Sequence, residues 1–127
     1  MPRSEGFSAS QRYDIDRAIR AAETASRFEF SVYVGSCEGE PRAYAERLHT
    51  SLGTPQRSVL IMIDPQRRVL EVVTGSVVRR DLDDDHVKLA VVAMQSALSV
   101  GDLVGAIERG LAQLSDAARA PETLHTD

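Results

Sequence analysis

One nearly continuous apolar segment, Ser58 to Ile63, constrains the fold more than any other part of the chain. Its sequence is Ser-Val-Leu-Ile-Met-Ile, and turn-forming residues flank it, with Gly53 to Pro55 before it and Asp64-Pro65 after it. A short apolar run bounded in this way is typical of a strand that is covered on both faces. The segment therefore predicts the central strand of a sheet enclosed by helices.

Two further strands and four helices are predicted around this segment. Apolar and polar residues alternate over 28–34, which predicts a strand with one buried face, and Val69 to Thr74 is expected to return as an antiparallel hairpin partner. Apolar residues at helical spacing predict helices over about 8–26, 41–52, 82–98 and 103–114. The expected fold class is α/β, a small mixed sheet covered by helices in the order α-β-α-β-β-α-α.

The helix ends carry local signals. Ser8 and Gln11 have the spacing of a capping box at the start of the first helix. Pro41 suits the first turn of the second helix, because its missing amide would have no partner there. His49 lies on that helix among polar residues, so we expect it to face solvent.

Length and composition limit the domain count and the class of partner. The 127 residues suffice for one compact domain, which we place at residues 7–118, with flexible tails at 1–6 and 119–127. The 15 Lys and Arg residues against 19 Asp and Glu leave a formal charge of -4, which argues against nucleic acid as a partner. The single cysteine, Cys37, excludes an internal disulfide.

Hydropathy gives the expected location. Residues 1–9 are polar and lack the apolar core of an export signal, and no apolar stretch approaches the roughly 20 residues that span a bilayer. We therefore expect a cytoplasmic protein without a transmembrane segment, for which peripheral association with a membrane stays open.

The densest group of metal-ligand side chains comprises Asp81, Asp83, Asp84 and Asp85, followed by His86. Hard cations such as calcium or magnesium take carboxylate oxygens, so Asp81, Asp83 and Asp84 are candidate metal ligands. Aspartates at a helix N-terminus also cap free amides, and this second interpretation is favoured. The spacing excludes a calcium loop of the EF-hand type.

Asp64 and Cys37 are two further candidate site residues. Asp64 ends the central strand, where α/β folds often place ligand sites, but Asp-Pro also starts turns and we predict a turn residue. Cys37 has no histidine beside it in the sequence, which favours an inert loop thiol. No known catalytic or nucleotide-binding motif occurs, so no catalytic residue is nominated.

The order of elements and several motifs resemble the TPM domain family of thylakoid-lumen, bacterial envelope and actinobacterial proteins. The resemblance covers about Phe7 to Asp116. The matching stretches are Phe30 to Gly35, Tyr44 to Leu48 with Gly53, Ser58 to Asp64, Arg68 to Gly75, Leu82 to Asp84, and Gly101-Asp102 through Gly110-Leu111. Pro55 to Ser58 departs from the asparagine-glycine pattern that is common in that family.

The resemblance and the residues together suggest two main functions, and a third, weaker one is a calcium-binding regulatory role without turnover. The first is a small accessory or binding domain that acts through a protein partner, and it agrees with the lack of catalytic motifs. The alternative, which the resemblance implies, is a calcium-binding, divalent-metal-dependent enzyme similar to acid phosphatases.

Overall fold

The structure is a computed structural model, and residues 6–119 are those that it describes. Its strands are β1 (Glu29–Val34), β2 (Ser58–Asp64) and β3 (Val69–Thr74), and its α-helices are α1 (Ala9–Ser26), α2 (Pro41–Thr50), α3 (Asp84–Ser99) and α4 (Leu103–Ala118). Short 3-10 helices, η1 (Pro55–Arg57) and η2 (Val78–Arg80), precede β2 and follow β3. The predicted flexible tails lie largely outside the described residues.

The three strands form one mixed sheet in the order β1-β2-β3. β1 and β2 run parallel, with Phe30 opposite Val59, whereas β2 and β3 form an antiparallel hairpin, with Ile61 opposite Val72. Every residue of β2 is buried, as the apolar run predicts. The α/β fold class and the order α-β-α-β-β-α-α are therefore confirmed.

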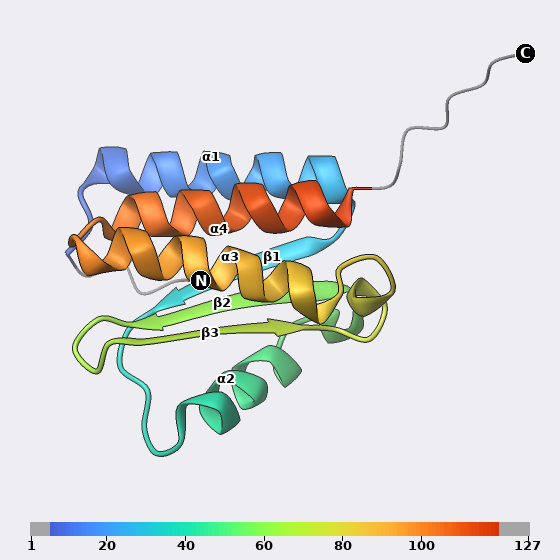
Figure 1. Cartoon of the computed structure of the whole chain (residues 1–127), viewed down its shortest axis with the longest axis horizontal. Helices are drawn as coiled ribbons and strands as arrows, with labels where there is room; N and C mark the ends of the chain where they lie inside the picture. The colour runs from blue at the N-terminus through green and yellow to red at the C-terminus, as the bar shows by residue number, and fades with distance from the viewer. Residues whose placement is uncertain (1–5, 120–127) are drawn as a thin grey trace, which may run out of the picture.

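The sheet separates two hydrophobic cores (Figure 1). Helices α1, α3 and α4 lie on one face and α2 on the other. The larger core contains alternate strand residues such as Val32, Ile61 and Val72, together with Ile107 and Leu111 of α4. The smaller core, under α2, contains Cys37, Ala45, Leu60, Met62 and Val73. Because side chains alternate along a strand, β2 can contribute to both cores only if it is apolar throughout.

The predicted helix signals are present. Ser8 and Gln11 form a reciprocal capping box at α1, and Pro41 is the first residue of α2. None of the helices within residues 6–119 combines the length and the apolarity needed to cross a membrane.

The prediction for His49 is wrong. The side chain is buried, and Nε2 lies 2.9 Å from the carbonyl oxygen of Ser58. His49 follows Ala45 by four residues, so both lie on the face of α2 that packs on the sheet. The imidazole can be buried because it pairs with the carbonyl oxygen of Ser58 at the start of β2. The polar neighbours of His49 in the sequence do not indicate such a partner.

Candidate functional site

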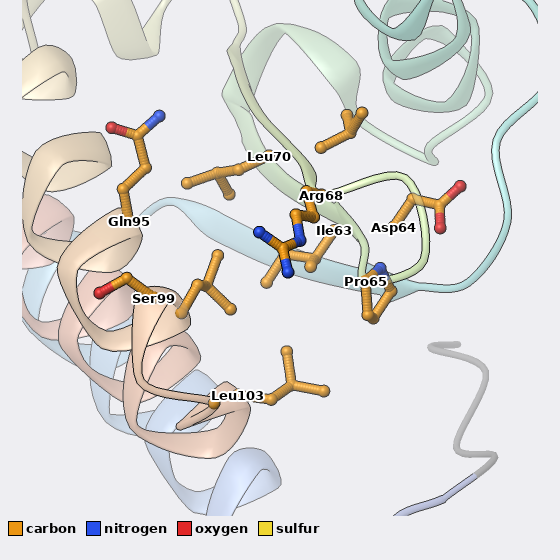
Figure 2. A pocket seen from close by; sticks show the side chains of 11 residues that line it. Ile63, Asp64, Pro65, Arg68, Leu70, Gln95, Ser99 and Leu103 are labelled. Atoms are coloured by element: carbon orange, nitrogen blue, oxygen red, sulfur yellow. The ribbon is translucent and has the colours of Figure 1, made fainter.

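A pocket of about 660 Å³ lies at the carboxyl end of β2. It is bounded by the end of the β2–β3 hairpin, the last turn of α3 and the start of α4 (Figure 2). Its lining residues are Ile63, Asp64, Pro65, Arg68, Val69, Leu70, Gln95, Leu98, Ser99, Gly101 and Leu103. The volume is within the range of about 300 to 1,000 Å³ that small-molecule sites occupy.

Asp64 organises the loops beside this pocket and does not point into it (Figure 2). One carboxylate oxygen, Oδ2, accepts a hydrogen bond of 3.0 Å from the amide of Cys37, in the loop after β1. The other, Oδ1, accepts from the amides of Gln66 and Arg67, which confirms the predicted turn role. The carboxylate points away from the pocket, so the structure does not support Asp64 as a ligand-binding residue at this edge of the sheet.

The pKa of Asp64 reflects two opposing effects. Burial disfavours the charged form and by itself would raise the pKa. The hydrogen bonds from the amides of Cys37, Arg67 and Gln66, and from the Cys37 side chain, together outweigh burial and hold the pKa below its ordinary value. Asp64 is thus a structural anion at neutral pH.

Arg67 strengthens the same connection between the two loops. Its Nη1 donates to the carbonyl oxygens of Cys37 and Gly39, each at 3.0 Å, and lies 3.3 Å from Cys37 Sγ. The Cys37 side chain is buried in the smaller core. Asp64 and Arg67 therefore hold the β1–α2 loop against the hairpin turn from both sides.

Arg68, the next residue, is in a different situation. Figure 2 shows its guanidinium extending over Ile63 between the hairpin and α3. Within residues 6–119 it has no hydrogen-bond acceptor, ion-pair partner or aromatic ring in contact. The side chain is exposed on one side of the pocket, so its positive charge is available to a ligand.

The remaining pocket residues are mainly apolar. Ile63, Leu70 and Leu103 point toward one another across the pocket, while Gln95 and Ser99 of α3 lie at its edge (Figure 2). Ser99 Oγ donates to the carbonyl oxygen of Ser96, and no histidine is among the described lining residues, so this serine lacks a general base. The pocket is suited to binding an apolar group that carries a negative charge.

The acidic segment 81–86 lies away from this pocket. Asp83 is the N-cap of α3, its Oδ1 accepts from the amide of His86 at 3.0 Å, and the same oxygen lies 2.8 Å from His86 Nδ1. Asp84 is in the first turn of α3, and Asp81 is the C-cap residue that follows η2. The capping interpretation is confirmed for Asp83. These hydrogen bonds, with the attraction of His86, lower the pKa of Asp83.

Calcium or magnesium binding by Asp81, Asp83 and Asp84 stays a prediction. In the described part of the chain, no three or more His, Cys, Asp or Glu side chains are grouped so that they could hold a metal ion. The side chains of all three aspartates are exposed.

We expect Asp83→Ala to lower the melting temperature of the domain, because the amide of His86 loses its acceptor at the first turn of α3. Asp81→Ala is the matched control, since Asp81 is exposed and does not cap α3. Equal melting temperatures of the two variants would contradict the capping role.

Calorimetric titration with calcium tests the metal prediction, which requires both substitutions to reduce the heat of binding.

Sequence reasoning missed Arg68 and the residues around it. The pocket combines a hairpin turn with residues 95–103, which are more than twenty-five positions further along the chain. The available signal is the pair of adjacent arginines after Asp64-Pro65. The sequence does not distinguish Arg67, which binds the loop, from Arg68, whose guanidinium has no partner in the described part of the chain.

Two uncharacterized proteins of Mycobacterium tuberculosis are similar in sequence. Rv2468c of strain H37Rv and MT2543 of strain CDC 1551 are each 30% identical to the chain over 109 residues. The match covers 86% of this chain and 65% of each relative, so the chain spans slightly less than two thirds of their length. A family model described as a domain of unknown function (DUF5130) matches residues 1–115.

Solved structures share the fold. The BA42 protein of the psychrophilic bacterium Bizionia argentinensis superposes with a TM-score of 0.81 at 21% identity, covering 93% of this chain and 86% of that one. The N-terminal domain of cg2496 from Corynebacterium glutamicum gives a TM-score of 0.77 at 17% identity, over 98% and 84% of the two chains. At these identities the likeness establishes the fold alone.

The family match corrects the resemblance to the TPM domain, which is wrong: the model that matches is DUF5130. The motifs behind the resemblance were a buried strand, a closing glycine and helix stripes. Such patterns encode layers and turns, so different families with the same order of elements can share them.

Proposed function

Because the chain belongs to the DUF5130 family, whose described function is unknown, we propose its function from its own geometry: it is a non-catalytic domain that docks a protein partner at the pocket beside β2. The observation that carries this proposal is the guanidinium of Arg68, which has no side-chain partner within residues 6–119 and lies beside a mainly apolar pocket. An apolar site with few polar groups that fix orientation is a general design for binding.

A protein partner is favoured over a free small molecule by the surface beside the pocket. Val100 stands between two lining residues, Ser99 and Gly101, and its side chain is 79% exposed. On α3, Val92 precedes the lining residue Gln95 by three positions and Leu89 precedes Val92 by three, so both lie along the same face of the helix. They are 62% and 60% exposed. A ligand confined to the pocket would leave these side chains in water, whereas a protein surface would cover them.

Site-specific photocrosslinking tests the docking function. A benzoylphenylalanine at position 100, in the full chain expressed in a mycobacterial host, is expected to form a discrete adduct with a partner. The same group at Thr24, an exposed residue of α1, is expected to form none. Comparable adducts from both positions would contradict docking at this surface.

A second pair of variants tests whether formation of the adduct depends on the pocket. Gln95 is exposed and lines the pocket, so Gln95→Trp is expected to obstruct it and to abolish the adduct from position 100. Gln113→Trp is the matched control, because Gln113 is an exposed residue of α4 that does not line the pocket. An adduct that persists in Gln95→Trp would refute the pocket as the docking site.

A further inference from the structure

The backbone at Arg68 is strained in a way that favours glycine. Arg68 has φ of 57°, in the left-handed region that residues with a Cβ seldom adopt. It completes the hairpin turn, where its amide donates to the carbonyl oxygen of Pro65 at 3.4 Å. Glycine would satisfy this turn with less strain, and strained residues of this kind concentrate at functional sites.

The two neighbouring arginines have separate roles. Arg67 is committed to the carbonyl oxygens of Cys37 and Gly39, whereas the guanidinium of Arg68 has no acceptor within the described residues. Since Asp64 is occupied by three backbone amides and points away, it does not neutralise Arg68. An anion from outside the chain is therefore the complementary partner of Arg68.

β3 is an edge strand of the sheet, and its first residues line the pocket next to this cation. The amide of Gly75 donates to the carbonyl oxygen of Ser58 on β2. In an antiparallel pair, residues alternately direct their N–H and C=O groups toward and away from the partner strand, so those of Leu70, Val72 and Thr74 point away from β2. Arg42 of α2 occupies the carbonyl oxygen of Val72, and Arg79 occupies that of Thr74. The groups of Leu70 remain at the pocket, where an extended peptide could pair with them.

We propose that the pocket binds the carboxyl terminus of the partner polypeptide, an inference that rests on the docking function proposed above. The terminal carboxylate pairs with Arg68, and an apolar last side chain packs among Ile63, Leu70 and Leu103. A last residue carries both groups on one Cα. In an extended internal segment, by contrast, adjacent side chains point to opposite faces, so an acidic and an apolar side chain on one face are two residues, or about 6.6 Å, apart.

Fluorescent hexapeptide pools test this inference on the full chain. One pool ends in leucine with a free carboxylate and is random elsewhere, a second is its carboxamide, and a third is a carboxamide with glutamate next to the leucine. The free-acid pool is expected to bind, and amidation is expected to weaken binding by about tenfold or more, because a charge-assisted pair is lost.

Arg68 and Arg27 both have left-handed backbone conformations, and variants at these positions distinguish an effect on peptide binding from an effect on stability. Arg68→Gly is expected to raise the melting temperature and yet to weaken binding of the free-acid pool about tenfold or more. Arg27→Gly is the matched control, because Arg27 also has positive φ, at 68°, but ends α1 far from the pocket residues. It should raise the melting temperature and leave binding unchanged. Arg68→Gln removes the charge without the added backbone freedom and should also weaken binding.

The outcomes distinguish this inference from the docking function. Equal binding of the acid and amide pools, or binding that Arg68→Gly and Arg68→Gln leave intact, overturns carboxyl-terminal recognition. Tighter binding of the glutamate pool overturns it in favour of an internal acidic segment. If no pool binds while the pocket-dependent adduct at position 100 persists, this inference fails and the docking function stands. If that adduct is also missing, both fail.

Discussion

Asp64→Ala is expected to destabilise the domain by about 3 kcal/mol, because it removes one acceptor group that serves three backbone amides. The amide of Cys37, 3.0 Å from Oδ2, is buried and would have no other acceptor, while the amides of Gln66 and Arg67 lie in the turn. Urea unfolding followed by circular dichroism measures the change. Asp14→Ala, at an exposed position of α1, is the control and should change little.

The stability of the domain should also depend on pH through Asp64. Its pKa is lower in the folded chain than its ordinary value of 3.8, so the unfolded chain binds a proton more readily. The stabilisation by the carboxylate is therefore fully present above that ordinary value and is lost as pH falls through the lower folded pKa. Asp64→Asn removes the titrating group and should flatten this acid limb. An unchanged acid limb would refute the role of Asp64.

Gly75→Ala is expected to destabilise the domain by about 3 kcal/mol, near the upper end of overpacking effects. A Cβ at this position would overlap the carbonyl oxygens of Pro55 and Gln56, which are backbone atoms and cannot rotate away. Two hydrogen bonds hold these segments together, from Gly75 to Ser58 and from Val77 to Gln56. The strand end would have to move, and those bonds would weaken.

Gly53→Ala is the matched control for this prediction. A Cβ at Gly53 would have no heavy atom within 4 Å, and the φ of Gly53 lies outside the left-handed region. The substitution should change the unfolding free energy by less than about 0.5 kcal/mol. Thermal unfolding of both variants provides the comparison, and a Gly75→Ala protein as stable as Gly53→Ala would show that the close approach of the two segments is unimportant.

Much of the fold was predictable because periodicity reports burial directly. The uninterrupted apolar run of β2 predicted a strand buried on both faces, and the capping box at Ser8 predicted the start of α1. His49 shows the limit of this reasoning, since its burial depends on a carbonyl oxygen nine residues away. Local polarity does not reveal such a partner.

The candidate site was much less predictable. Asp64 was correctly placed in a turn, but its link to Cys37 joins two loops that the sequence separates by 27 positions. The pocket needs the hairpin turn and the α3–α4 junction to meet, which requires the packing of α3 and α4 over the sheet. The resemblance to another family also rested on shared periodic motifs and did not identify the correct family.

By itself the sequence determined the strands, the helices, their order and the central place of β2, because each depends on residues close together in the chain. Only the tertiary structure decided which of two adjacent arginines would have no side-chain partner among the described residues. Arg67 reaches carbonyl oxygens of the β1–α2 loop, whereas the left-handed backbone of Arg68 places its guanidinium beside the pocket. The physical reason is that a long side chain forms hydrogen bonds with acceptors far away in the sequence. The positions of those acceptors are determined by the packing of the whole domain.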